Sequence, residues 1–230
     1  MIGVLVNVVA ILVGAIIGVL FNKVLSEKIT SAVMMSLGIV TFIIGIKTAL
    51  KIQNELLLTL SVAIGTAIGT IIDIDKYVND LGEFFKKSFA KNANDSRFAE
   101  AFASASILFA VGAMSVLGSI EAGLNHDYSV LFLKSTLDFC AALIYGSTLG
   151  IGVAFSSFTI LVFEGLIALF AGSLTFLAKD ELLMNEFSAV GNLLVMMIGL
   201  NLMGVTKVKL ANMLPSIVMV VILYKFIVLH

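Results

Sequence analysis

The stretch IGVLVNVVAILVGAIIGVLF, residues 2–21, decides the fold of this chain. It contains no charged side chain, and it is as long as an α-helix must be to cross the hydrocarbon core of a bilayer, which takes about 20 predominantly apolar residues. No basic segment precedes it, and the apolar part of a cleaved signal is shorter. We therefore expect this stretch to remain as a membrane-spanning helix.

The rest of the chain has a similar composition. Of its 230 residues, 60% are hydrophobic and 13% are charged, whereas an ordinary soluble domain has about 45–50% apolar and about 25% charged residues. We expect an all-α integral membrane protein, with residues 1–230 forming one membrane domain surrounded by lipid. The net charge of −1 gives no reason to expect nucleic acid as a partner. The single cysteine, Cys140, excludes an internal disulfide and a multi-cysteine metal site, and no cofactor is predicted.

Apolar runs of spanning length predict a bundle of about eight membrane-spanning helices. The division between the fifth and the sixth is the tightest, because the stretch GIGVAFSSF (150–158) must hold the whole turn. The predicted spans are 2–22, 30–50, 55–72, 98–120, 129–153, 157–177, 186–205 and 209–229.

Lysine and arginine are distributed unequally between alternate loops, and an excess of these residues marks the cytoplasmic side of a membrane protein. The loops after the first, third and seventh predicted helices hold nine of them, and the opposite side holds four. This bias predicts that both termini lie outside the cell and that the long 73–97 loop lies in the cytoplasm.

The 73–97 loop is the only extended polar stretch, and helical periodicity separates its apolar side chains from most of its charged ones. It is interpreted as an amphipathic helix on the inner membrane surface, and a solvated linker is the alternative. The apolar residues near one helical face are Tyr77, Leu81, Phe84, Phe85 and Phe89.

Three GxxxG steps occur on helices predicted to run from outside to inside. Two glycines four residues apart remove the side chains from one helix face, which lets two backbones approach closely in lipid. Helix packing is the favoured role, and a close backbone wall around a ligand is the alternative. The three pairs are Gly14 with Gly18, Gly65 with Gly69, and Gly146 with Gly150.

Similar glycine-containing segments end other predicted helices, at 44–47, 117–121 and 203–207. Pairing helices two with three, four with five and seven with eight gives three similar hairpins, of which the third is inverted relative to the first two. These weak internal repeats favour a transporter, because inverted repeats with a site at their interface are a feature of many transporter folds.

Lys134 and Asp138 lie four residues apart in the fifth predicted helix and share a face with Tyr145. A charge at the centre of a spanning helix costs about 2.5–3.5 kcal/mol on insertion scales, whereas a charge pair on one helix contributes only about 0.2–0.5 kcal/mol. Stabilising the isolated helix therefore does not explain the pair. Either the two residues tie this helix to its neighbours, or they line a cavity and contact a polar solute or ion.

Other polar side chains occur within the predicted spans. Glu164 lies near the middle of the sixth helix, where a neutral, hydrogen-bonded carboxyl group and an ion-coupling group are both compatible with the sequence. Asn7 and Asn192 lie on polar, small-residue faces of the first and seventh helices, and either can instead bond a neighbouring helix. The candidate residues for binding a substrate or ion are Lys134, Asp138, Glu164, Asn7, Tyr145 and Asn192.

Three blocks of the chain resemble the YdfK/YqgA-like family of bacterial polytopic inner-membrane proteins, a domain of unknown function. They are GVLVNVVAILVGAIIGVLF at the start, GAMSVLGSIEAGLNHDYSVLFLKSTLDF in the middle and VKLANMLPSIV near the end. The resemblance covers nearly the whole chain and implies a multi-pass protein of the bacterial inner membrane, a transporter among the functions considered for the family. It implies no substrate, mechanism or active residue, and it associates the position of Glu164 with glutamine.

These observations predict a protein that moves a small polar solute or ion, passively or coupled to an ion, because no nucleotide-binding loop occurs. The alternative is a non-transporting scaffold or sensor that uses the 73–97 segment as its partner surface. An enzyme is not expected, because neither His126 nor His230 lies within a predicted span and no HExxH pattern occurs. No catalytic residue is predicted, and a homo-oligomer is compatible with the sequence.

Overall fold

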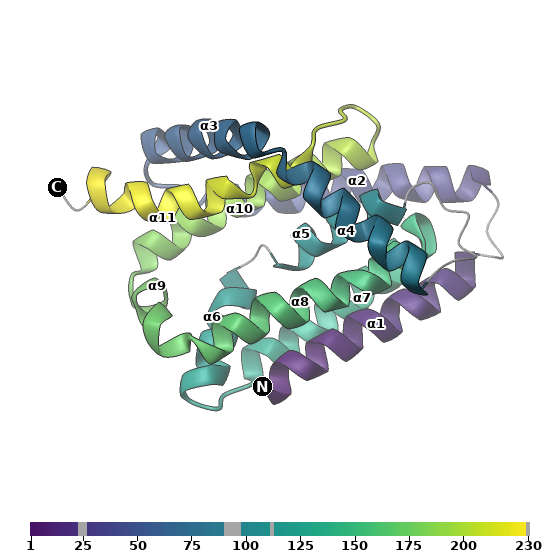
Figure 1. Ribbon diagram of the computed structural model, residues 1–230, viewed down its shortest axis with the longest axis horizontal. Coiled ribbons are helices and arrows are strands. Elements are labelled where there is room, and N and C mark those ends of the chain that lie inside the picture. The colour runs from purple at the N-terminus through teal and green to yellow at the C-terminus, as the bar shows by residue number, and fades with distance from the viewer. Residues whose placement is uncertain (23–26, 90–97, 111–112, 229–230) are drawn as a thin grey trace. The chain divides into compact units, whose positions relative to one another are not determined.

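The computed structural model describes residues 1–22, 27–89, 98–110 and 113–228 (Figure 1). The regular structure in these ranges is helical, without a strand. The chain divides into two compact units, each assembled from two separate parts of the sequence. The first unit contains Met1–Met34 and Asn79–Phe176, and the second contains Met35–Val78 and Leu177–His230.

The first unit is built around two helices that pack through their glycines. A Cβ atom added to Gly14 would lie 2.5 Å from the backbone oxygen of Phe139, and one added to Gly146 would lie 2.5 Å from the backbone oxygen of Ala15. Gly18 faces Leu143 in the same way. The helices of this unit are α1 (Ile2–Asn22), α5 (Phe98–Ala110), α6 (Ala113–Leu124), α7 (Ser129–Leu149) and α8 (Gly152–Leu169), followed by the short 3-10 helix η1 (Ala171–Leu174).

The second unit uses its glycines similarly. Gly65 packs against Ser216 and Gly69 against the backbone of Asn212, and Gly45 packs against Met196. Side-chain caps fix two helix starts, because Asn54 accepts a hydrogen bond from Leu57 N and Asp180 accepts one from Leu183 N. The helices of this unit are α3 (Glu55–Ile72), α10 (Glu181–Leu202), η2 (Leu210–Met213) and α11 (Pro215–Ile227), with most of α2 (Glu27–Ala49) and part of α9 (Thr175–Lys179).

Each predicted span coincides with a helix or a pair of helices. Six of the described helices are long and apolar enough to cross a membrane, namely α1, α3, α7, α8, α10 and the η2–α11 segment. The pair α5 and α6 passes the same test together but is bent by 61°, as a broken span or a re-entrant loop, and it adds a seventh span if the two helices form one. The apolar part of α2, Ser31–Lys47, is shorter than a full span by the same criteria. The structure thus confirms an all-α, polytopic helical bundle.

Several helix boundaries differ from the sequence prediction. The helix expected over 129–153 ends at Leu149, because Gly150 has φ +89°, a backbone conformation that glycine adopts readily. The next helix therefore begins at Gly152, earlier than the expected 157, and ends at Leu169. Pro215 does not kink a helix, since it is the first residue of α11, where the missing N–H leaves no hydrogen bond unmade.

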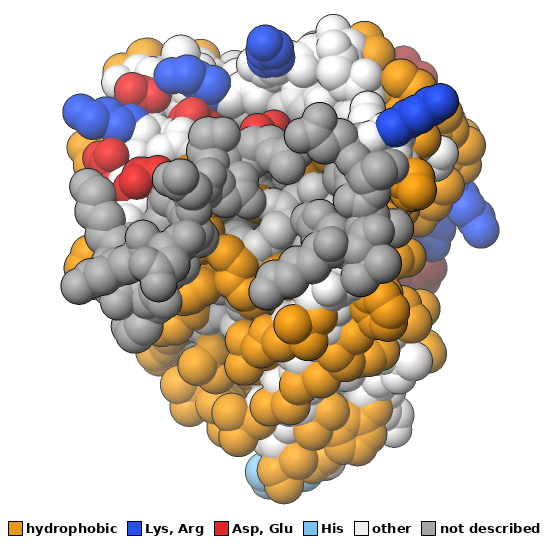
Figure 2. All heavy atoms as spheres, turned by 90° about the vertical axis from the view of Figure 1, so that its right-hand side faces the viewer, with side chains coloured by type: hydrophobic (Ala, Val, Ile, Leu, Met, Phe, Trp, Pro, Cys, Tyr) orange, Lys and Arg blue, Asp and Glu red, His pale blue; other side chains and the backbone are white. Residues whose placement is uncertain are grey.

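Hydrophobic side chains cover much of the visible face of the protein (Figure 2). On α1, the exposed set recurs with helical spacing and includes Leu5, Val9, Leu12, Ile16 and Leu20. An outward-facing apolar surface of this kind is the surface that a lipid bilayer would cover.

The amphipathic segment forms a helix, α4 (Ile74–Phe89). Three of its five predicted apolar side chains, Tyr77, Leu81 and Phe84, are exposed. Phe85 is buried and lies within 6 Å of three aromatic rings of the first unit, those of Phe102, Phe155 and Phe158. The side chain of Phe89 and all of residues 90–97 lie outside the described part of the chain.

Candidate functional site

Three charged side chains are buried among the spanning helices of the first unit. Lys134 and Asp138 of α7 are 5% and 8% exposed, and Glu164 of α8 is fully buried. Burying a charge is costly unless it is paired and hydrogen-bonded. The three residues are called the charge cluster below.

Glu164 lies at the centre of the charge cluster. Its Oε1 atom accepts hydrogen bonds from Asn7 Nδ2 at 3.0 Å and from Ser115 Oγ at 3.2 Å, and it lies 3.3 Å from Lys134 Nζ. Its Oε2 atom lies 3.2 Å from Asn7 Nδ2. The carboxyl group therefore has partners on α1, α6 and α7.

Lys134 connects the two carboxyl groups. Its ammonium group forms an ion pair with Asp138, one helical turn further along α7, and a second with Glu164 across the helix interface. A lysine has three donor hydrogens, so one ammonium can serve both acids. The predicted pairing of Lys134 with Asp138 is thus present, but it is part of a larger network.

The packing of α1 on α7 brings Asn7 to this network. The buried residues Asn7, Gly14 and Gly18 follow each other at helical spacing on α1, so they share the face that contacts α7. On α7, Gly146 lies eight residues after Asp138, again on one face. Close contact between the glycine faces therefore places the Asn7 amide beside the charged part of α7.

The break between α5 and α6 supplies the remaining donor. Ser115 lies in the first turn of α6, and its hydroxyl group contacts both the backbone oxygen of Phe109, at 2.9 Å, and Glu164. A hydroxyl group carries one proton, so it donates to one of these acceptors at a time. The N-terminal turn of a helix also favours a nearby negative charge.

The other two predicted site residues are Tyr145 and Asn192. Tyr145 is buried on α7, two turns beyond Asp138. Asn192 belongs to the second unit, where its Nδ2 atom donates to the backbone oxygen of Ser188, 2.8 Å away on the same helix. The structure therefore brings together Asn7, Lys134, Asp138 and Glu164, and it adds Ser115, which the sequence reasoning missed.

A third buried carboxyl group, which the sequence reasoning also missed, lies in the second unit. Glu186 of α10 is fully buried, and its Oε1 atom accepts hydrogen bonds from the backbone N–H groups of Gln53 and Asn54 at 2.9 and 2.8 Å. These groups immediately precede α3, whose first turn leaves donors unpaired. Glu186 thus fixes the start of α3, which is a structural role.

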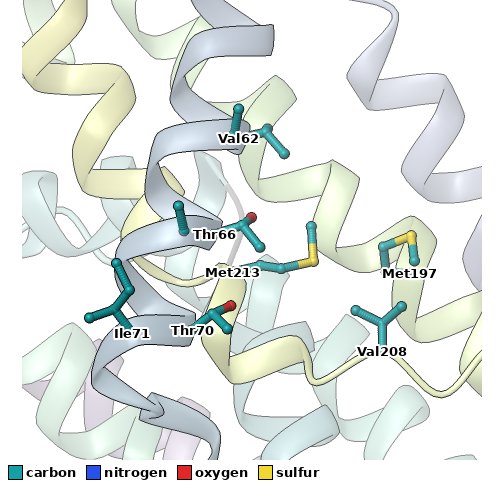
Figure 3. Close-up of a pocket in the computed structure, with 9 residues that line it drawn as sticks. Val62, Thr66, Thr70, Ile71, Met197, Val208 and Met213 are labelled. Atoms are coloured by element: carbon teal, nitrogen blue, oxygen red, sulfur yellow. The ribbon is translucent and has the colours of Figure 1, made fainter.

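The second unit also carries an open groove of about 700 Å³ (Figure 3). Thr66 lies on α3 at one side, and Met197 and Met213 lie opposite (Figure 3). Apart from Thr66 and Thr70, the residues that line the groove are apolar. The groove therefore offers little to hold a charged solute. Among the described residues, no group of three or more His, Cys, Asp or Glu side chains is placed to hold a metal ion.

Apolar helices of spanning length, with charges buried between them, define a polytopic α-helical membrane protein. The chain belongs to the family described as "Protein of unknown function (DUF554)", which matches residues 2–225. It is 31% identical over 221 residues to the "Uncharacterized membrane protein YdfK" of Bacillus subtilis (strain 168), covering 94% of this chain and 93% of that protein. It is also 31% identical over 222 residues to the "Uncharacterized protein YqgA" of Escherichia coli (strain K12), covering 95% and 94%. No solved structure matches the chain.

Proposed function

We propose that this membrane protein is a transporter, and not an enzyme, that moves a small polar solute or ion passively or coupled to an ion gradient. The observation that carries this proposal is the charge cluster, with its three ionisable groups buried between spanning helices. Ionisable residues within spanning segments are rare, and they commonly mark the pathways of ions, protons and substrates.

Structural stability alone gives a poor account of the charge cluster. Replacing a buried ion pair by well-packed apolar residues is often neutral or stabilising by about 1–4 kcal/mol. The helices of this unit already have close backbone contacts through Gly14 and Gly146, so they do not need charges to associate. A functional requirement for Lys134, Asp138 and Glu164 explains why the charges are present.

The broken span gives independent support. Helices interrupted near the middle of the membrane are common in transporters, where the free ends of the half-helices contact substrates and ions. Here the bend between α5 and α6 places Ser115 on Glu164. The bacterial inner membrane, with both termini outside, is the proposed location and orientation, supported by the loop distribution of Lys and Arg.

Solute uptake into proteoliposomes tests this proposal. The purified protein would be screened with a panel of small polar metabolites and ions, with and without a proton or sodium gradient. We expect uptake of at least one solute, and its loss in the double variant Lys134→Gln with Asp138→Asn. The exposed Asp80→Asn variant is the matched control and should keep the parent rate. A double variant with the full uptake rate would remove the charge cluster from the transport site.

A second candidate function is a scaffold or sensor that acts through α4. The observation that favours it is the exposed set Tyr77, Leu81 and Phe84, on a helix that Phe85 anchors to the first unit. A lipid surface also explains this exposed set, because amphipathic helices lie in the membrane interface with their apolar face inward. Labelling of α4 in a bilayer, described below, separates these two interpretations.

A further inference from the structure

The charge cluster is not electrically balanced among the described residues. With all three groups ionised, Asp138 and Glu164 contribute two negative charges and Lys134 one positive charge, which leaves a net charge of −1 in a buried site. The helices packed against α7 carry no further cationic side chain in the described residues, and the N-terminal ammonium group belongs to Met1, directly before α1. Helix α1 has no ionisable side chain, Glu121 of α6 is bonded to Asn125 near the end of its helix, and Glu100 of α5 is exposed.

An unpaired acceptor lies beside this charge. The side chain of Asn7 is fully buried, and its Nδ2 atom donates to Glu164, but its Oδ1 atom has no hydrogen-bond donor in the described structure. The same amide also interacts with Asp138. A buried acceptor without a donor is unfavourable. One additional hydrogen-bond donor that brings one positive charge would therefore bond the Oδ1 atom of Asn7 and neutralise the net charge of the cluster.

The two carboxyl groups differ in their surroundings. Glu164 accepts from Asn7, Ser115 and Lys134, and hydrogen bonds from several donors favour the ionised form of a carboxyl group. The side chain of Asp138 is 12% exposed, and its one described ion-pair partner is Lys134. Asp138 is therefore the less buried of the two carboxyl groups and has fewer described donors, so it is the better placed to take up a proton.

The geometry points to an exchangeable proton on Asp138: we propose that the charge cluster binds one proton there, and that this proton is the coupling ion. The coupling role rests on the transport function proposed above. Binding transfers one proton from water to an Asp138 carboxylate oxygen, which gives a neutral carboxylic acid and a net cluster charge of zero. The new O–H group is a donor beside Asn7, whose buried Oδ1 acceptor lacks one.

A metal cation fits this site less well than a proton. The ammonium group of Lys134 already lies against both carboxyl groups, so it repels a second cation and occupies the space between the acids. A cation such as sodium also needs several oxygen ligands, whereas a proton needs one acceptor. When Asp138 is neutral, the ammonium of Lys134 is attracted to Glu164 alone, which links proton binding to the contact between α7 and α8.

Infrared difference spectroscopy over a pH range tests the proton site without any transport assay. The protein would be studied in lipid nanodiscs, and the signal is the carbonyl stretch of a protonated carboxylic acid. We expect a band that appears reversibly as the pH falls, and that shifts when aspartate is labelled with ¹³C at its carboxyl carbon but not when glutamate is. Replacing sodium by choline in the buffer should leave the band unchanged.

Variants then locate the band. Removing either acid leaves one acid balanced by Lys134, so Asp138→Asn and Glu164→Gln should each lose the band at the pH where the parent shows it. Asp80→Asn, an exposed substitution of the same type, should keep it. Because the labelling experiment uses the parent protein, it decides the question even if a variant fails to fold.

Several outcomes would overturn the proposal. They are the absence of a titrating band, a band that follows the glutamate label, a band that persists in Asp138→Asn, and a band that responds to sodium. If the band behaves as expected but solute uptake ignores a pH gradient, the coupling role is wrong. If the band behaves as expected and no solute is moved at all, the transport function is wrong and the proton site stands.

Discussion

The side-chain amide of Asn7 donates to the carboxyl group of Glu164 at 3.0 Å, across 157 positions of the sequence. This bond joins α1 to α8, and both residues are fully buried. Asn7 is therefore a hydrogen-bond partner of the charge cluster that lies on neither α7 nor α8.

Replacing Asn7 should therefore destabilise the protein. We expect Asn7→Ala to lower the free energy of unfolding by about 1.5–3 kcal/mol, the usual contribution of a hydrogen bond to a charged group. Unfolding by SDS in mixed micelles would measure the change. The control is Asn125→Ala, which removes an exposed bond between Asn125 and Glu121 and should change the value by less than about 0.5 kcal/mol. Equal effects at the two positions would contradict the role given to Asn7.

A double-mutant cycle separates the structural and functional roles of Lys134 and Asp138. The single variant Asp138→Asn leaves Lys134 paired with Glu164 alone. The single variant Lys134→Gln leaves both acids without a cation. We expect Lys134→Gln to be the more damaging, at about 3–5 kcal/mol, because it leaves uncompensated buried charge. Adding Asp138→Asn to it should recover part of that loss, and additive effects would mean that the pair is not coupled.

The glycine contact between α1 and α7 predicts a steric effect. We expect Gly146→Leu to lower stability in detergent by about 1–3 kcal/mol, because the new side chain would meet the backbone of Ala15. Gly172→Leu is the matched control, since an added Cβ at Gly172 has no atom within 4 Å. Equal thermal unfolding of the two variants would show that α1 and α7 do not pack through this face.

Cysteine labelling in intact cells tests the proposed orientation. In a Cys140→Ala background, Ser129→Cys should react with a membrane-impermeant thiol reagent added from outside, and Lys207→Cys should react only after the cells are opened. Both positions are exposed in the structure, so differences in reactivity report the side of the membrane. Labelling of position 207 from outside would reverse the orientation.

The exposed face of α4 should lie in the membrane interface. An environment-sensitive dye on Phe84→Cys is expected to show apolar surroundings in a nanodisc and to be quenched by lipid-attached quenchers. The same dye on the exposed Lys76→Cys should show an aqueous environment. If both dyes report water, α4 does not lie on the bilayer, and a protein partner for Tyr77, Leu81 and Phe84 becomes the better interpretation.

The sequence was sufficient to predict the helical membrane bundle, because spanning length and apolar composition act locally. It also singled out Asn7, Lys134, Asp138 and Glu164, since polar side chains stand out within apolar runs. Their association was not predictable from one sequence, because it depends on the packing of α1 on α7 over more than 120 residues. For the same reason, periodicity placed Asn192 on a polar face but could not tell that it belongs to the second unit.

Ser115 and Glu186 were missed for different reasons. A serine in a spanning helix usually bonds its own backbone, and the 98–120 run is apolar throughout, so only a weak sign marked the break that turns Ser115 toward Glu164. The one signal is the adjacent glycine in VGAMS (111–115). Glu186 stood at the predicted start of a helix, where an acid is ordinary. The structure begins that helix at Glu181, which places Glu186 inside it.

The sharp turn at Gly150 has a consequence for the biogenesis of the protein. It joins α7 and α8 into one hairpin, and the two arms carry all three residues of the charge cluster. Separate insertion would bring each charge into the bilayer alone, at about 2.5–3.5 kcal/mol apiece near a helix centre. If α7 and α8 insert together as one hairpin, Lys134 enters the bilayer at the same time as Asp138 and Glu164. The ion pairs can then form within one short segment of the chain during insertion.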